Sequence, residues 1–214
     1  MPARALSRLL ILAAVLSGFA YTAPARALDA TAASAFVTRA LDDAIRTFSG
    51  KTMSPADKAR AAQELIGRYA DLKGLSAAIL ARYWTSATAD QQEKFLPLLV
   101  EYALSAWAPM GELGGSDKMR ITGTEPNGPS VVVHSLIGSP GDAPTPLDWT
   151  VSTAADGRLI ITNVAVDHVS FVRTMHDDFA SYLANNGGQL ATLMAAMQKK
   201  IDAATPAAQS ASGK

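Results

Sequence analysis

The chain of 214 residues contains no cysteine, only three histidines, and equal numbers of basic and acidic residues, 19 of each. The missing thiols exclude disulfide bonds, thiolate metal sites, a cysteine nucleophile and a cysteine-linked lipid anchor. The balanced charge excludes a strongly basic nucleic-acid-binding protein, whose affinity depends on clustered lysine and arginine. An acidic disordered chain is excluded as well, because 49% of the residues are hydrophobic. We therefore expect a folded protein that binds no nucleic acid.

The sequence motifs of common enzymes and metal sites are also missing. There is no G-x-S-x-G, and Gly50-Lys51-Thr52 lacks the earlier glycine of a phosphate-binding loop, since Ile45 stands there. The three histidines, His134, His168 and His176, form no H-x-x-x-H pair. We therefore expect no catalytic residue, no metal ligands and no cofactor.

The first 27 residues resemble a bacterial export signal. Arg4 and Arg8 stand at its start, an apolar run extends from Leu9 to Ala20, and Ala25-Arg26-Ala27 is an A-x-A cleavage site. The apolar run has about a dozen residues, fewer than the ~20 of a membrane-spanning helix. Cleavage after Ala27 would leave 16 basic and 19 acidic residues and a net charge of about −3. We expect a soluble periplasmic protein, and an uncleaved membrane anchor is the alternative.

Helical spacing of apolar residues dominates both ends of the remaining chain. Helices are expected to begin near Thr31, Ser54, Leu75, Thr88, Val169 and Leu190. The third of them is expected to end near Tyr83. Ser54 followed by Pro55, and Thr88 followed by Gln91, are typical of helix N-termini. Pro97 is expected to kink the helix that Thr88 begins.

The middle of the chain alternates apolar and polar residues with period two. This pattern predicts strands over residues 118–122, 130–137, 147–152 and 158–166, and Asp156-Gly157 is typical of a tight hairpin. Consecutive antiparallel strands with helices on both sides predict an α+β fold with a sheet of about four strands. The C-terminal end is rich in Ala, Ser, Pro and Gln, a composition that favours disorder. We expect one domain over 28–203 and a disordered tail over 204–214.

Two long stretches carry a resemblance to a known family. They run from Glu64 to Leu113 and from Asn163 to Met197. The matching positions of the first stretch are Asp71-Leu72, Leu80-Ala81-Arg82-Tyr83-Trp84, Ala87-Thr88, Gln91, Phe95 and Tyr102. In order and spacing the chain resembles the MlaC family, also called the toluene-tolerance auxiliary family, and Trp149 occupies the place of the family's strand tryptophan. The departures are Ala81 and His168, where the family pattern has glycine, Asn163, where it has aspartate, and Pro97.

The resemblance implies a periplasmic phospholipid carrier that is a monomer and not an enzyme. It implies transfer of phospholipid between an outer-membrane lipoprotein complex and the lipid-binding subunit of an inner-membrane ABC transporter, which maintains outer-membrane lipid asymmetry. We expect helices packed on a curved antiparallel sheet, with an apolar lipid cavity between them. The residues expected to line it are Leu80, Trp84, Phe95, Leu99, Tyr102, Val133, Trp149, Val151, Ile161, Phe171 and Phe179.

Three other functions stay open at this point. The cargo of the same fold could be a hopanoid or another polycyclic lipid. An isomerase or hydratase would use Asp148, Asp167 or His168 as a base, and requires a carboxylate in the cavity with a raised pKa. A structural adaptor would show a large exposed apolar patch instead of a cavity.

Overall fold

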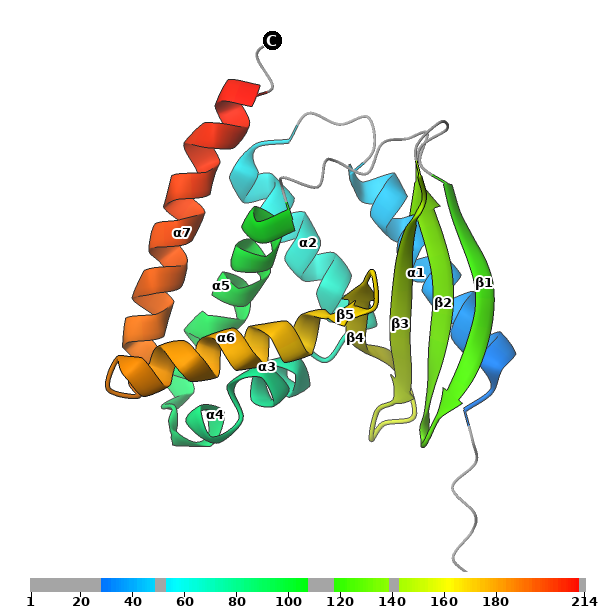
Figure 1. Ribbon diagram of the computed structural model, residues 1–214, viewed down its shortest axis with the longest axis horizontal. Helices are drawn as coiled ribbons and strands as arrows, with labels where there is room; N and C mark the ends of the chain where they lie inside the picture. The colour runs from blue at the N-terminus through cyan, green and yellow to red at the C-terminus, as the bar shows by residue number, and fades with distance from the viewer. Residues whose placement is uncertain (1–27, 49–52, 108–117, 139–142, 212–214) are drawn as a thin grey trace, which may run out of the picture.

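The molecule has two halves, a β-sheet covered by one helix and a group of six helices (Figure 1). The computed structural model describes residues 28–48, 53–107, 118–138 and 143–211. The expected export signal at 1–27 lies outside the described residues.

The sheet is an antiparallel meander in the order β1-β2-β3-β4-β5. Its strands are β1 (Lys118–Asn127), β2 (Ser130–Gly138), β3 (Thr145–Thr153), β4 (Leu159–Val166) and β5 (Val169–Ser170). The β3–β4 hairpin turns at Gly157, whose φ of 85° is one that glycine adopts without strain. The predicted α+β class is therefore confirmed, with a short fifth strand beyond the expected four.

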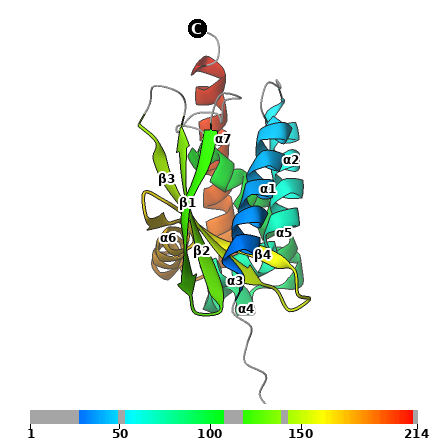
Figure 2. The same cartoon turned by 90° about the vertical axis from the view of Figure 1, so that its right-hand side faces the viewer.

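The first helix, α1 (Ala30–Phe48), belongs to the sheet half (Figure 2). Its buried face packs on β1 and β2. The buried residues of that face are Ala33, Phe36, Val37, Ala40 and Leu41. They recur at intervals of three, one, three and one, which is the apolar stripe of an amphipathic helix. Figure 1 shows the C-terminal part of α1 leaving the sheet toward the helical half.

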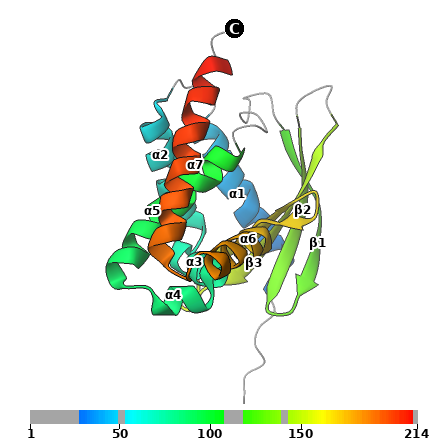
Figure 3. The same cartoon turned by 60° about the vertical axis from the view of Figure 1, so that its left-hand side comes forward.

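The helical half consists of two segments separated in sequence by the sheet. Its helices are α2 (Pro55–Tyr69), α3 (Leu72–Leu80), α4 (Arg82–Ser86), α5 (Ala89–Trp107), α6 (Phe171–Asn185) and α7 (Leu190–Ala211). Helices α5 and α7 lie side by side, and α6 packs on α3 (Figure 3). Each pair therefore joins an early helix to a late one.

Two helix N-termini form as the sequence predicts. The Ser54 hydroxyl accepts a hydrogen bond of 3.1 Å from the backbone N–H of Asp57. The hydroxyl of Thr88 accepts from the N–H of Gln91 at 3.2 Å, and the side-chain oxygen of Gln91 accepts from the N–H of Thr88 at 2.9 Å. This reciprocal pair is a capping box that satisfies two backbone donors.

Several expected helix bounds were wrong. The helix expected from Leu75 to Tyr83 is broken at Ala81, where α3 ends and α4 begins. The helix expected from Val169 begins at Phe171, because the two preceding residues pair with β4 as β5. The backbone of α7 is helical to Ala211, beyond the domain limit at 203 drawn from composition, and that limit and the kink at Pro97 stay predictions.

The break at Ala81 leads to a stability prediction. Ala81 has φ 46° and ψ −120°, a conformation that glycine tolerates and a residue with a Cβ adopts only under strain. Replacing Ala81 with glycine is expected to raise the free energy of unfolding by about 1 kcal/mol, because strain relief exceeds the added entropy of the unfolded chain. Urea unfolding followed by circular dichroism measures the change, and Ala78→Gly inside α3 is the control that should destabilise by about 1 kcal/mol.

Strand β4 is attached to the helical half at two places. Ala70, which follows α2, forms an isolated parallel bridge with Ile161. The side-chain oxygen of Asn163 accepts hydrogen bonds from the Ser170 hydroxyl at 2.9 Å and from the N–H of Val172 at 3.2 Å. The start of α6 and the end of α2 are thus both attached to the same strand.

Candidate functional site

The eleven residues expected to line a lipid cavity fall into two separate apolar clusters. The helical cluster contains Leu80, Trp84, Phe95, Leu99, Tyr102 and Phe179 as buried members, with Phe171 packed against it. The sheet cluster contains Val133, Val151 and Ile161, with Trp149 packed against it. The sequence therefore identified buried residues, and the structure brings them together as two groups rather than one.

The helical cluster is held by aromatic side chains in edge-to-face contact. The ring of Phe95, which is fully buried, lies 6.2 Å from Trp84 and 6.4 Å from Phe179. Tyr102 lies 5.7 Å from Phe179. These geometries are the ones that aromatic pairs prefer. The rings join α4, α5 and α6 into one packed core, so they stabilise the fold.

The sheet cluster fixes the orientation of the strand tryptophan. Val133 on β2 stands opposite Trp149 on β3, and both side chains belong to the cluster beneath α1. The Trp149 indole N–H donates to the hydroxyl of Ser135 at 2.9 Å, and that hydroxyl donates to the carbonyl of Leu147 at 3.0 Å. Ser135 is 2% exposed, so these bonds are shielded from water and hold the indole in place.

A half-buried apolar stripe lies outside both clusters, and the sequence analysis did not include it. On α1 the apolar face continues as Ile45 and Phe48, and α2 carries Leu65 and Ile66; all four side chains are only half buried. Among the described residues neither cluster includes them. We call these four residues the α1/α2 stripe. Its sequence signal was the apolar helix face itself, which does not distinguish core from binding surface.

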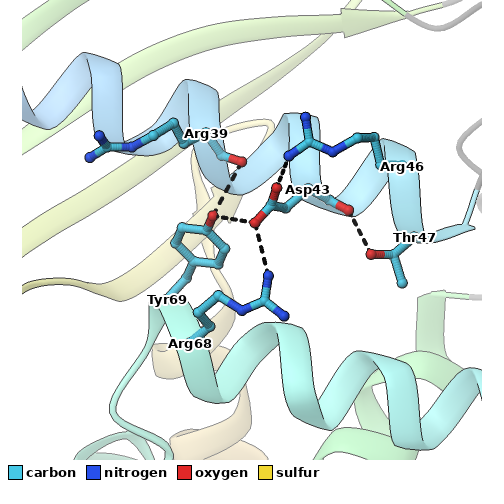
Figure 4. A network of polar contacts seen from close by, with 6 residues as sticks. All are labelled: Arg39, Asp43, Arg46, Thr47, Arg68 and Tyr69. Carbon is cyan, nitrogen blue, oxygen red and sulfur yellow. Dashed lines mark hydrogen bonds and ion pairs between the residues drawn. The ribbon is translucent and has the colours of Figure 1, made fainter.

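A polar network joins α1 to α2 (Figure 4). Asp43 on α1 accepts hydrogen bonds from the Tyr69 hydroxyl at 2.6 Å, from Arg68 on α2 at 3.0 Å and from Arg46. The Tyr69 ring makes an edge contact with Phe36 of the sheet cluster at 5.4 Å. The bond from Tyr69 is the largest influence on Asp43 and lowers its pKa, the two arginines lower it further, and burial raises it less. Asp43 is therefore an ionised acceptor that joins α1 to α2.

Asp148 is not the raised-pKa base that an enzyme would need. Its two carboxylate oxygens pair with Nδ1 of His134 at 2.7 Å and Nδ1 of His168 at 2.8 Å. Burial alone would raise the pKa of Asp148, but the hydrogen bonds and charges of the two histidines outweigh burial and lower it. Asp167 and His168 occupy the exposed turn between β4 and β5. Asp148 therefore joins β3 to β2 and to the turn between β4 and β5, which is a structural role.

Asp148 should make stability depend on acidity. Because its pKa in the folded state is below the unfolded value of about 3.8, its ionisation stabilises the fold fully above that pH, and this stabilisation is lost as the pH falls further. We expect Asp148→Asn to lower the melting temperature between pH 5 and 7 by roughly 2–4 °C. The difference from the parent protein should shrink below about pH 4. Thermal unfolding at each pH measures it, and Asp90→Asn is the exposed control.

Other kinds of site find little support in the described part of the chain. No group of three His, Asp or Glu residues there is placed to hold a metal ion. No helix there is long and apolar enough to cross a membrane. The large hydrophobic residue exposed among the described ones is Val169, 61% exposed, which is not the broad patch of an adaptor. A surface depression of about 240 Å³ between α4 and the start of α7 contains none of the eleven expected residues.

Comparison with known proteins identifies the family. Residues 37–199 match the family described as MlaC protein. The chain belongs to the MlaC family. A search among curated proteins gives no match. Among solved structures, a phospholipid-binding protein from Ralstonia solanacearum, in complex with a phospholipid, has a similar fold with a TM-score of 0.67 and 18% sequence identity. The similarity covers 80% of this chain and 97% of that one.

The structure explains why the MlaC pattern has glycine at two positions where this chain departs from it. The pattern has glycine at Ala81 and at His168, and both have positive φ here, 46° and 65°. Glycine adopts such φ values freely, which is why it suits both positions. His168 compensates through its bond to Asp148. Asn163, at the pattern's aspartate, still accepts the two hydrogen bonds that hold the start of α6.

Proposed function

We propose that this MlaC protein is a soluble carrier of phospholipid in the periplasm. The observation that carries the proposal is the family match over residues 37–199, together with the similar fold of a protein solved with a phospholipid bound. We also propose its finer role: transfer between an outer-membrane lipoprotein complex and the lipid-binding subunit of an inner-membrane ABC transporter, which supports outer-membrane asymmetry. Export by residues 1–27 would bring it to that compartment.

Physical chemistry explains why such a carrier is needed. Each methylene that leaves water gains about 0.8 kcal/mol, so an acyl chain of about 16 carbons favours an apolar site by roughly 12 kcal/mol. Free lipid therefore does not cross an aqueous compartment at a useful rate. The carrier must cover the chains with apolar side chains and leave the head group near water.

We propose that the acyl chains bind at the boundary between the helical cluster and the sheet cluster. The two clusters are already packed, with Phe95 and Val133 fully buried. The α1/α2 stripe offers half-buried apolar surface. Its α1 residues belong to the C-terminal part of that helix, which leaves the sheet (Figure 1). Acyl chains that enter there would cover Ile45, Phe48, Leu65 and Ile66. They would reach the eleven expected residues if the sheet half and the helical half move apart. The cavity itself stays part of the proposal.

Lipid analysis of the purified protein tests the function. We expect protein purified without detergent to contain about one phospholipid per chain, found by mass spectrometry after extraction, and delipidated protein to take up phospholipid from vesicles. A polycyclic lipid in place of phospholipid would assign the hopanoid alternative. A protein that contains no lipid and takes none up would contradict lipid carriage altogether.

A further inference from the structure

Two polar residues are buried in the described part of the chain, and both are serines. Ser76 on α3 is 0% exposed and Ser135 on β2 is 2% exposed. The hydroxyl of Ser135 bonds to the indole of Trp149 and to the carbonyl of Leu147. The hydroxyl of Ser76 has no hydrogen-bond partner among the described residues. A buried hydroxyl without a partner destabilises the fold, because it has given up its hydrogen bonds to water.

Other helical hydroxyls of this chain bond to their own helix. Thr38, Thr47 and Thr174 donate to the carbonyl four residues earlier at 3.0, 2.7 and 2.9 Å. Ser105 donates to the carbonyl three residues earlier at 2.8 Å. Such a bond to the preceding turn is the usual one for a serine inside a helix. Ser76 does not make it, so its hydroxyl is a shielded donor that no described group uses.

Ser76 lies on the buried face of a helix that borders the sheet. Ile79 and Leu80, three and four residues later, share this face and belong to the helical cluster. Helix α3 packs on α6 (Figure 3) and also contacts α5 and β4. It begins two residues after Ala70, whose bridge to Ile161 attaches the helical half to β4. Ser76 is therefore a polar position on the apolar face of a helix at the boundary between the two halves.

We propose that the Ser76 hydroxyl donates a hydrogen bond to an ester carbonyl of a glycerophospholipid bound between the helical cluster and the sheet cluster. This inference rests on the proposed function and adds to it a contact that recognises the ester linkage of the cargo. Access to Ser76 requires the same movement of the two halves that the acyl chains require.

The chemistry of Ser76 favours the ester group over the phosphate. An ester carbonyl is an acceptor without charge, so a single neutral donor is enough to satisfy it in an apolar site. A phosphate there would keep a buried charge that one hydroxyl does not compensate. The ester groups of a phospholipid join its chains to its head group. A bond from Ser76 to one of them would therefore leave the chains among apolar side chains and the phosphate nearer to water.

Two phospholipids with the same chains and the same head group provide the test. Dioleoylphosphatidylglycerol has ester carbonyls, and its ether analogue di-O-oleylphosphatidylglycerol has methylene groups in their place. Delipidated protein is incubated with vesicles that contain equal amounts of both, and mass spectrometry gives the ratio of ester to ether lipid in the protein. This ratio is expected to be about fivefold higher in the parent than in Ser76→Ala, because the variant has lost the bond to the carbonyl.

The matched control removes the other buried hydroxyl. Ser135→Ala should keep the parent's ratio of ester to ether lipid. Thermal unfolding of the delipidated protein distinguishes the two serines a second time. Ser135→Ala should lower the melting temperature, because it leaves the buried indole of Trp149 without its acceptor. Ser76→Ala should not lower it, because the lost hydroxyl had no partner in the described part of the protein.

Three results would overturn the proposal. The first is an equal lipid ratio in the parent and in Ser76→Ala. The second is the same change of ratio in Ser135→Ala, which would trace the effect to a general change of the fold. The third is a melting temperature of Ser76→Ala as low as that of Ser135→Ala, which would assign the hydroxyl to a partner in the lipid-free protein. A parent that takes up neither lipid would contradict lipid carriage itself, and this inference with it.

Discussion

Replacing Phe95 by alanine is expected to lower the free energy of unfolding by about 3–5 kcal/mol. Its side chain is fully buried, and its ring contacts those of Trp84 and Phe179. Truncation removes these contacts and leaves a cavity between α4, α5 and α6. Urea unfolding followed by circular dichroism gives the change in free energy.

A second phenylalanine provides the matched control. Phe48 on α1 is only half buried and lies outside both clusters of the described residues. Phe48→Ala should cost roughly 1 kcal/mol, because part of its surface already contacts water. Losses of similar size at the two positions would contradict the division between a packed core and a half-buried stripe.

The largest functional effect is expected from charges placed on the stripe. Ile45→Asp with Ile66→Asp should reduce phospholipid uptake from vesicles by at least about 30-fold, equivalent to about 2 kcal/mol. Acyl chains would have to desolvate two unpaired carboxylates, whereas the apo protein leaves these half-buried positions near water. Fluorescent phospholipid transfer measures the uptake, and circular dichroism checks the fold.

Two variants control for volume and for charge. Ile45→Leu with Ile66→Leu keeps the apolar surface and should retain uptake. Thr38→Asp adds a charge to the exposed side of α1 and should have no effect. If the aspartate pair on the stripe left uptake intact, the chains would have to bind elsewhere, and the placement of the acyl chains would be wrong.

Local chemistry explains which elements could be predicted from the sequence. Ser54 and Thr88 mark helix starts because a cap depends on residues within three positions of it. The β3–β4 turn at Gly157 is equally local. The break at Ala81 was missed, because alanine carries no sequence signal for the positive φ that it adopts there.

Long-range packing explains why the site was predicted only in part. Hydrophobic spacing shows that Phe95 and Val133 are buried, but not that they belong to different clusters, since this depends on strand register and on where α1 crosses the sheet. The stripe residues Ile45 and Ile66 have the same sequence pattern as core residues. Their half-buried state depends on how α1 and α2 pack in three dimensions, which no local pattern shows.

The order of elements along the chain has a consequence for folding. The sheet half takes its helix from residues 30–48 and its strands from 118–170, and the helical half takes α2–α5 before the sheet and α6–α7 after it. Neither half is therefore a continuous piece of chain. Helices α3 and α5 find their packing partners, α6 and α7, only at the C-terminal end of the sequence. We conclude that the two cores should unfold in one cooperative transition, and that cutting the chain between α5 and β1 would yield no independently folded fragment.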